Sequence, residues 1–240
     1  ILIVTGFLVY KMISSSRKQE GYKRWKATGS GDTANEETAG NKWKHGAWLR
    51  HALGVTTPKA RTYPVFDEEA VVWCAGLLGV EAVRLKEILQ DVSSHYREFW
   101  IRKRKGGYRM ISAPDKELKS IQDTIYHRIL LPVNVHPVAT GFRRQHSIVD
   151  NVRPHLGKRC VLKTDIHDFF LSIRSPRVKQ TFENIGYPKN ISKVLGELCC
   201  RRRHLPQGAS TSPALSNIIA YEMDRKLAAM AEEFGLAYTR

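Results

Sequence analysis

Residues 163–173 read KTDIHDFFLSI, and the run CVLKTDI at residues 160–166 is typical of a short buried strand. Asp165 stands near the end of this predicted strand. A carboxylate there, together with a neighbouring backbone carbonyl, offers hard oxygen ligands suited to Mg²⁺. Two metal ions at such a site would activate an attacking oxygen and stabilise a leaving phosphate. An aspartate after a strand is also a common turn former or helix N-cap, so this motif alone leaves both interpretations open. We expect Asp168 to face solvent or to serve the local structure.

Residues 205–217 read LPQGASTSPALSN, and their small side chains would permit a close approach of the backbone to a ligand. Ser212 is predicted to cap the following helix, with Pro213 at its first position. Helix N-termini favour phosphate groups, although a plain loop with a cap would show the same residues. The helix is predicted over residues 212–234, because apolar residues recur there every three or four positions.

Residues 99–114 read FWIRKRKGGYRMISAP, in which two β-prone runs flank Gly106 and Gly107. This pattern predicts a β-hairpin with a glycine turn. Six cations lie within residues 97–109 and are opposed by Glu98 alone, which favours binding to polyphosphate. A solvated charged edge that prevents strand-to-strand aggregation is the alternative interpretation.

The whole chain of 240 residues is strongly basic, with 39 Lys and Arg against 23 Asp and Glu, a net charge of +16. Such a surplus indicates a polyanionic partner, and nucleic acid is the commonest one. Two more basic loops, at residues 141–147 and 201–204, could grip a nucleic-acid backbone. The hydrophobic share of 42% is ordinary for a globular protein and excludes wholesale disorder. The four cysteines form no framework, which favours reduced thiols in the cytoplasm.

The N-terminal quarter differs in composition from the rest. Residues 1–10 are mostly apolar, but the run is too short to cross a bilayer. Residues 11–41 are polar and small, as in a linker. Beyond them, helical and strand-like patterns alternate, with a helix break expected near Gly186 and Pro188. This alternation predicts a mixed α/β or α+β protein.

The motifs occur in an order that resembles bacterial reverse transcriptases, specifically retron and antiphage-defence enzymes. The matching stretches, from about Phe66 to Arg240, are YRMISAP, LKSIQ, ATGFRRQHSI, KTDIHDFFLSI, LPQGASTSPALSN and AYTR. Group II intron enzymes are similar in the fourth and fifth stretches but usually have glycine where this chain has Ala209. The form TSPALSN, at residues 211–217, is more similar to retron enzymes.

This resemblance implies an α+β, right-hand polymerase fold. It implies an N-terminal extension with a polar linker at residues 1–62, fingers at residues 63–159, and a partial palm at residues 160–240. It further implies that Asp165 is the catalytic metal-binding carboxylate, with the carbonyl of Ile166 on the same metal.

The resemblance also implies a set of nucleotide-binding residues. Phe170 matches an aromatic steric gate beneath the sugar, whose ring leaves no room for a ribose 2′-OH. Arg109 matches a fingers arginine that holds the triphosphate, with Arg102 or Lys103 as its basic companion. Two residues match the loop that lines the nucleotide pocket and supports the template base: Gln207 and Gly208.

The function implied is that of an RNA-directed DNA polymerase, which adds dNTPs to a primer 3′-OH on an RNA template with two Mg²⁺ ions. We expect a retron-like, cytoplasmic enzyme linked to antiviral defence. Its expected partners are the RNA template, the RNA/DNA hybrid, dNTPs and a structured non-coding RNA, and we expect no membrane partner.

In this family the strand that begins near Leu236 continues into Tyr-x-Asp-Asp, which supplies two more catalytic carboxylates, whereas this chain stops at Arg240. The resemblance therefore implies a fragment without the Asp-Asp hairpin and the thumb, inactive alone, whose last strand lacks its hairpin partner and leaves an open sheet edge. Two alternatives stand beside this hypothesis. One is a non-catalytic RNA-binding module that keeps the fold, and the other is a membrane-tethered protein in which residues 1–10 end an anchor.

Overall fold

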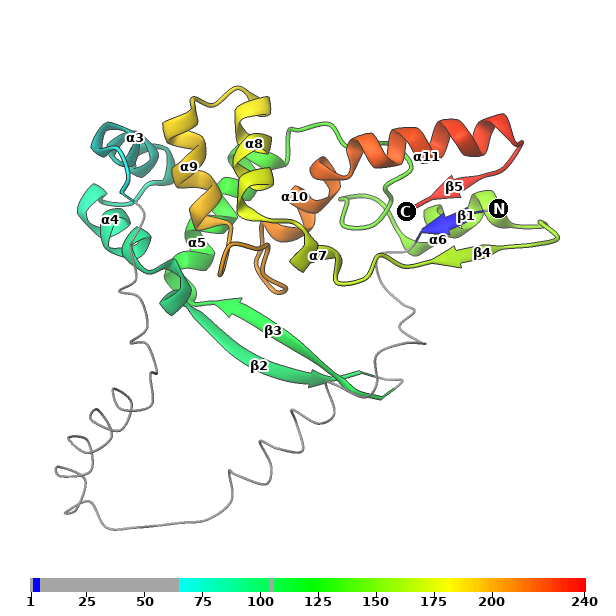
Figure 1. Cartoon of the computed structure of the whole chain (residues 1–240), viewed down its shortest axis with the longest axis horizontal. Coiled ribbons are helices and arrows are strands. Elements are labelled where there is room, and N and C mark those ends of the chain that lie inside the picture. Colours follow the sequence, from blue (N-terminus) through cyan, green and yellow to red (C-terminus); the bar gives the residue numbers. More distant parts are fainter. Residues whose placement is uncertain (1, 5–64, 104–105) are drawn as a thin grey trace, which may run out of the picture. The chain divides into compact units, whose positions relative to one another are not determined.

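The computed structural model of the chain describes residues 2–4, 65–103 and 106–240 (Figure 1). The predicted linker at residues 11–41, and nearly all of the predicted N-terminal extension, lie outside the described residues. No helix in the described part of the chain is both long and apolar enough to cross a membrane. The described residues form helices and two small sheets, in agreement with the predicted mixture of helix and strand.

Helices α3 (Glu68–Leu78), α4 (Ala82–Gln90), α5 (Lys116–Ile125), α8 (Ser175–Ile185) and α9 (Lys189–Leu198) pack around one apolar core. Its largest fully buried side chains include Leu85, Ile88, Leu118, Ile121, Ile125, Phe182, Leu195 and Leu198. Asp67 caps α3 by accepting a hydrogen bond from the N–H of Glu69, and Gly79 ends that helix in the left-handed conformation. The predicted helix break near Gly186 is confirmed, because α8 ends there.

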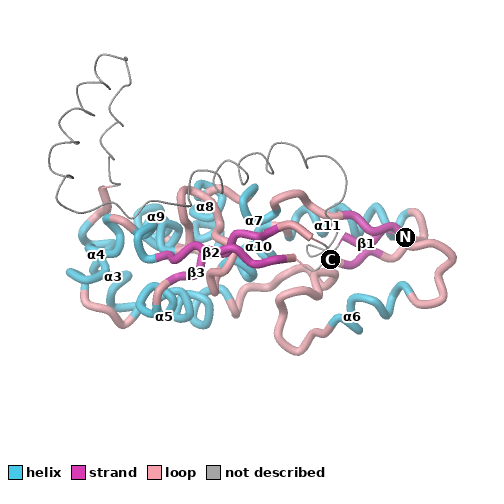
Figure 2. Tube along the Cα trace, turned by 90° about the horizontal axis from the view of Figure 1, so that it is seen from below, coloured by secondary structure: helices cyan, strands magenta, loops and turns pink. Residues whose placement is uncertain are grey.

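Strands β2 (Tyr96–Arg102) and β3 (Tyr108–Pro114) form the predicted antiparallel hairpin. Gly106 and Gly107 have φ values of 87° and 78°, a conformation that side chains with a Cβ rarely adopt. The glycine turn is therefore confirmed as the reason why the chain reverses here. Figure 2 shows the two strands lying side by side along the helices.

A second sheet holds three parallel strands in the order β4 (Leu162–Thr164), β1 (Leu2–Val4), β5 (Tyr238–Thr239). All three residues of β4 are exposed, so the prediction of a buried strand is wrong. The physical reason is that no residue of β4 packs into either apolar cluster of the described residues, whereas Tyr238 of the other edge strand, β5, does. β5 pairs with β1 in parallel on one side and is the other edge strand of this sheet, so the expected hairpin partner stays a prediction.

The predicted helix over residues 212–234 is two helices, α10 (Ser212–Ile219) and α11 (Tyr221–Glu233), which meet at Ala220. The N–H of Ala220 donates to the carbonyl of Ser216, and the N–H of Asp224 donates to the carbonyl of Ala220. Helical hydrogen bonding thus continues through the junction, so the break is a bend at one residue. Gly235 ends α11 as predicted, with a φ of 64°.

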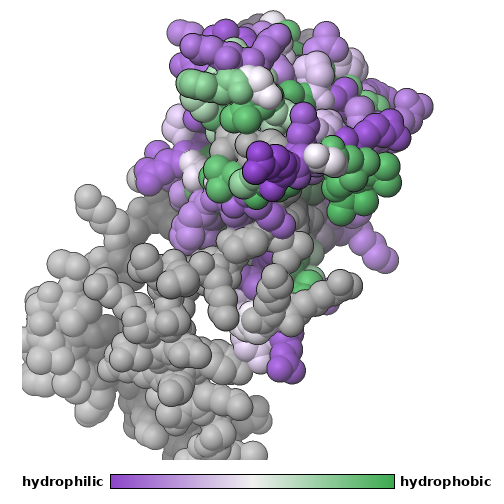
Figure 3. Space-filling model, turned by 90° about the vertical axis from the view of Figure 1, so that its right-hand side faces the viewer, coloured by the Kyte–Doolittle hydropathy of each residue, from purple (hydrophilic) through white to green (hydrophobic). Residues whose placement is uncertain are grey.

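Two shorter helices, α6 (Ile148–Val152) and α7 (Phe169–Ser172), lie in the connections. The face in Figure 3 belongs to the end of the molecule that carries α6, β4 and α11, and apolar areas interrupt its polar surface there. The exposed apolar side chains on these elements are Ile148, Val149, Val152, Leu162 and Met230. Short 3₁₀ turns at Val92–His95 and Arg153–His155 and a π turn at Tyr126–Leu130 complete the described elements.

Candidate functional site

A pocket of about 240 Å³ lies between the β2–β3 hairpin and the loop that precedes α10. Four of the predicted nucleotide-binding residues line it: Arg109, Phe170, Gln207 and Gly208. The other residues of its wall are Ile111, Phe142, Ala209, Ser212 and Pro213. The residues come from β3, α7, two loops and the start of α10, so folding gathers motifs that lie far apart in the chain.

The loop before α10 is attached to the hairpin through its backbone. The N–H of Ser112 in β3 donates to the carbonyl of Gln207 over 2.8 Å. Gly208 has a φ of 130°, and a Cβ there would lie 2.8 Å from the carbonyl oxygen of Ser112 and 2.9 Å from Cγ2 of Ile111. The close backbone approach that the sequence predicted is therefore made to β3. Only glycine fits at this position, because any side chain would push the loop off the strand.

Ser212 does not act as the predicted N-cap. The helix begins at Ser212 itself, after Thr211, and the Ser212 hydroxyl donates to the carbonyl of Pro206 over 2.7 Å. An N-cap side chain would instead accept a hydrogen bond from an N–H of the first helical turn. The hydroxyl thus closes the loop on itself and holds Gln207 and Gly208 at the pocket wall.

Two adjacent aromatic rings on α7 lie on different sides of that helix. Phe170 is 9% exposed and lines the pocket beside Arg109 and Gln207. Phe169 instead lines a second, smaller cavity of about 210 Å³ together with Ile219 and other apolar residues. Neighbouring helical positions are about 100° apart, so only one of two consecutive residues can face a given cavity. Phe170 is thus the ring of this pair that lines the pocket, and its predicted role as a steric gate stays a prediction.

Asp165 directly follows β4, and its side chain is exposed. Ile166 is half-buried and packs beside Tyr238. Asp168 is exposed in a left-handed turn with a φ of 48°, and it makes no side-chain cap bond to α7. The solvent-facing position expected for Asp168 is confirmed, and the carboxylate of Asp165 lies at the carboxyl edge of the parallel sheet.

Comparison with known proteins identifies the family of this chain. The family model described as "Reverse transcriptase (RNA-dependent DNA polymerase)" matches residues 101–239. The chain belongs to this family. It is 36% identical over 165 residues to the retron Ec86 reverse transcriptase of Escherichia coli, a match that covers 68% of this chain and 51% of the relative.

Two reverse transcriptases from Myxococcus xanthus are also similar. The retron Mx162 enzyme is 30% identical over 247 residues, which cover 93% of this chain and 50% of the relative. The retron Mx65 enzyme is 35% identical over 164 residues, which cover 61% of this chain and 38% of the relative. The predicted class, a bacterial reverse transcriptase of the retron type, is confirmed. The chain spans about half the length of the curated relatives it matches, or less.

The described part of this reverse transcriptase chain contains no group of three His, Cys, Asp or Glu side chains that could hold a metal ion. At the end of β4 it offers the exposed carboxylate of Asp165 beside the backbone carbonyl of Ile166. Mg²⁺ in nucleotide-processing sites is commonly held by one or two carboxylates together with substrate phosphates. Asp165 therefore fits as a first protein ligand for Mg²⁺.

The hairpin register separates the two candidates for the basic companion of Arg109. Arg109 lies opposite Ile101, whereas Arg102 lies opposite Tyr108. Residues paired across two strands lie on the same face of the hairpin, and successive residues of one strand lie on opposite faces. Arg102 therefore lies on the face away from Arg109. Lys103 follows at the start of the turn, and its N–H donates to the carbonyl of Gly107. The strand alternation favours Lys103 as the companion.

Arg201, predicted as part of a basic loop, has a different position. Its side chain is 8% exposed, forms an ion pair with Glu98 and donates to the hydroxyl of Ser112 over 3.2 Å. The hydrogen bond from Arg201 lowers the pKa of Glu98. Arg201 thus ties the base of the hairpin to the loop before α10, while Arg202 beside it is exposed.

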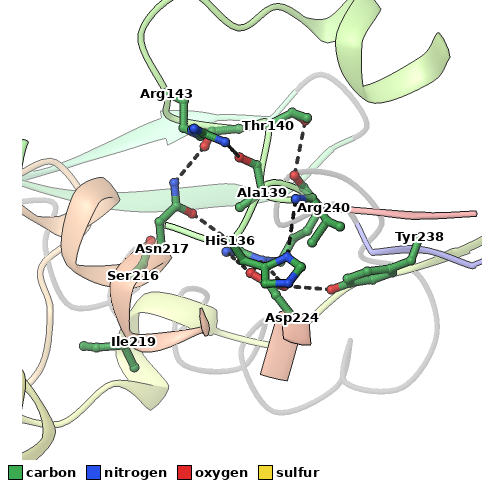
Figure 4. A network of polar contacts seen from close by, with 12 residues as sticks. His136, Ala139, Thr140, Arg143, Ser216, Asn217, Ile219, Asp224, Tyr238 and Arg240 are labelled. Carbon is green, nitrogen blue, oxygen red and sulfur yellow. Dashed lines mark hydrogen bonds and ion pairs between the residues drawn. The ribbon is translucent and has the colours of Figure 1, made fainter. Parts of the chain in front are cut away.

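Sequence reasoning missed a buried polar cluster at the end of β5 (Figure 4). Asp224, which is fully buried, accepts hydrogen bonds from the guanidinium of Arg240 and from the hydroxyl of Tyr238. Burial, and next the nearby charge of Asp224, raise the pKa of Tyr238. One signal in the sequence indicates that Asp224 is buried. Asp224 lies four residues from Ala220 and four from Ala228, so it falls on the apolar stripe of its helix.

Proposed function

We propose that the gene product to which this chain belongs is an RNA-directed DNA polymerase that adds dNTPs to a primer 3′-OH on an RNA template. The observation that carries this proposal is the pocket that unites Arg109, Phe170, Gln207 and Gly208 within the region of the family match. A lone basic motif or a lone aromatic residue would not support it, because each occurs widely on protein surfaces.

Each pocket residue has a physically distinct role in this proposal. The guanidinium of Arg109 offers several N–H donors and a fixed positive charge to a triphosphate. The ring of Phe170, fixed in the pocket wall, excludes a ribose 2′-OH by steric clash. Gln207 and Gly208 form the wall opposite β3 and position the template base against the incoming nucleotide. The backbone bond between Ser112 and Gln207 keeps the two sides of the pocket at a constant separation.

Asp165 and the Ile166 carbonyl would hold Mg²⁺, which when bound would neutralise phosphate charge and favour the attack of the primer hydroxyl. Strands β4 and β5 both pair with β1, and Ile3 faces Lys163 on one side and Thr239 on the other. A residue after Arg240 that continued β5 would therefore be level with Asp165. We propose that the full-length gene product places its further carboxylates there, that residues 63–159 form the fingers, and that the palm begins at residue 160.

The proposed partners are an RNA template, its RNA/DNA hybrid, dNTPs and a structured non-coding RNA. The net charge of +16 supports a polyphosphate partner. A role in antiviral defence is proposed from the resemblance to retron and antiphage-defence enzymes. The test is primer extension by the full-length gene product on RNA and on DNA templates of the same sequence, with sequencing of the product. Template-dependent incorporation of dNTPs on RNA is expected. If no incorporation occurs with Mg²⁺ and none occurs with Mn²⁺, the proposal is refuted.

A second candidate is an RNA-binding module without catalysis, which is favoured by the basic charge. The same assay separates the two, if binding of labelled RNA is measured in parallel. Salt-dependent RNA binding without incorporation by the full-length gene product would favour the module. The 240-residue chain alone is expected to bind RNA weakly and not to incorporate dNTPs.

A further inference from the structure

The carboxyl end of β5 is held by three buried side chains from three elements. The guanidinium of Arg240 donates from Nε and Nη2 to the carboxylate of Asp224, at 2.8 Å and 2.7 Å. Its Nη1 donates to Oδ1 of Asn217 at 3.0 Å. Asp224 is 0%, Asn217 2% and Arg240 7% exposed. Asp224 on α11 and Asn217 on α10 therefore both bind the guanidinium of Arg240, as Figure 4 shows.

The cluster also holds the backbone of the loop at residues 138–142. The N–H of Arg240 donates to the carbonyl of Val138, and the carbonyl of Arg240 accepts from the N–H of Thr140, both over 2.8 Å. The side-chain amide of Asn217 donates to the carbonyl of Gly141 over 2.8 Å. Asn217 therefore joins the guanidinium of Arg240 on one side to the loop on the other.

The next residue of this loop is Phe142, which lines the candidate nucleotide pocket. Its ring meets that of Phe170 edge to face, with the centroids 6.2 Å apart and the planes at 64°. Phe142 has a φ of 60°, a conformation that residues other than glycine keep only where their surroundings impose it. The side chain is 44% exposed, so burial of the ring alone holds it weakly. The hydrogen bonds at Thr140 and Gly141 restrain the backbone that carries this ring.

We propose that Asn217, together with the Asp224–Arg240 pair, is a positioning residue for nucleotide selection, because it holds Phe142 against Phe170 and so stiffens the wall that excludes a 2′-OH. Phe142 is a second specificity-determining ring in this pocket. The inference rests on the proposed polymerase function. A steric gate discriminates only if its ring cannot move away from the clashing group. A neighbouring ring that packs against the gate therefore adds to the discrimination without touching the reacting atoms.

The test compares single-nucleotide incorporation of dNTP and rNTP by the full-length gene product, three single variants and one double variant. Asn217→Ala removes both bonds of the amide but leaves the ion pair, and it is expected to lower the dNTP-over-rNTP ratio of kcat/KM about fivefold or more. Phe142→Leu is expected to lower the ratio by at least as much. The matched control is Gln122→Ala, which also removes a buried amide with two hydrogen bonds, to Tyr96 and to the carbonyl of Leu198, but does not line the pocket.

Gln122→Ala is expected to lower the thermal unfolding midpoint about as much as Asn217→Ala does. Its dNTP-over-rNTP ratio of kcat/KM should change less than about twofold. If Asn217 acts through Phe142, the double variant Asn217→Ala/Phe142→Leu should have nearly the ratio of Phe142→Leu alone. An unchanged ratio in Asn217→Ala, an equal fall in Gln122→Ala, or additive effects in the double variant would overturn the inference. Should Asn217→Ala fail to fold, an unchanged ratio in Phe142→Leu would overturn it. A wild-type protein that incorporates no nucleotide would instead refute the proposed function.

Discussion

Two strands of one parallel sheet end in opposite ways. β4 ends at Thr164 and is followed by Asp165, whose side chain is exposed. β5 ends at Thr239 and is followed by Arg240, whose side chain is buried and held by the fully buried Asp224. Both ends lie at the carboxyl edge of the sheet, since both strands run parallel to β1. The same edge thus carries one carboxylate open to solvent and another enclosed by protein.

Asp165 and Asp224 therefore illustrate two different roles of an acidic residue. A buried carboxylate with a bidentate guanidinium partner and a further hydroxyl donor has its acceptor sites occupied, so no ligand can reach it. Its role is to fix geometry, in this case that of β5 and of the loop at residues 138–142. An exposed carboxylate at a strand end can still take a metal ion or water. Asp165 is therefore the group proposed for chemistry, and Asp224 the one proposed for positioning.

The largest expected effect is the loss of incorporation in Asp165→Asn. An amide cannot replace a carboxylate as an anionic ligand of Mg²⁺, so primer extension should fall by about a thousandfold or more. Because Asp165 is exposed, the thermal unfolding midpoint and the affinity for RNA should stay near those of the wild type. Retained incorporation would refute the assignment of Asp165. A large fall in the unfolding midpoint of Asp165→Asn would show that Asp165, like Asp224, stabilises the fold.

The next effect in size is a loss of stability in Asp224→Ala. Removing one partner of a buried ion pair leaves the other charge uncompensated, which costs about 3–5 kcal/mol. Denaturant unfolding of the wild type and the variant measures this cost. The paired replacement Asp224→Leu/Arg240→Met should recover most of the stability, because it leaves no buried charge unpaired. If Asp224→Ala unfolds like the wild type, the cluster does not fix this end of the sheet.

A smaller effect is expected for Phe170→Ala, which acts on selectivity. Removing a ring that excludes the 2′-OH should lower the dNTP-over-rNTP ratio of kcat/KM by roughly tenfold or more, about 1.4 kcal/mol. The matched control is Phe169→Ala, because the neighbouring ring faces the other cavity. A fall in the ratio for Phe169→Ala and not for Phe170→Ala would reverse the assignment of the two rings.

The smallest effect concerns the ion pair of Glu98 with Arg201, which is less buried than that of Asp224. The pKa of Glu98 is lowered in the folded protein by its hydrogen bond from Arg201. Its contribution to stability is therefore fully present above the ordinary glutamate pKa of about 4.3, and it is lost as the pH falls through the lower folded value. The difference in unfolding midpoint between wild type and Glu98→Gln, followed from pH 7 down to pH 3, should shrink. A constant difference would show that the charge of Glu98 does not stabilise the hairpin.

Local features of this chain were predictable because they depend on neighbouring residues. The glycine pair at 106–107 is enough to set the hairpin, and the helix that begins after Asp67 ends at a glycine. The predictions failed where a distant segment decides the outcome. Burial of β4 depends on what covers the sheet, and the role of Ser212 depends on the carbonyl of Pro206, which the loop brings within 2.7 Å.

The sequence by itself determined the family, the hairpin, the helix break near Gly186 and the candidates for the site, since motif order and turn residues are properties of the chain alone. Only the tertiary structure decided which basic residue shares a face with Arg109, and that Asp224 is enclosed by Arg240. The physical reason is that burial, charge pairing and cavity walls are made by residues from separate elements. Their contacts exist only once those elements have packed together.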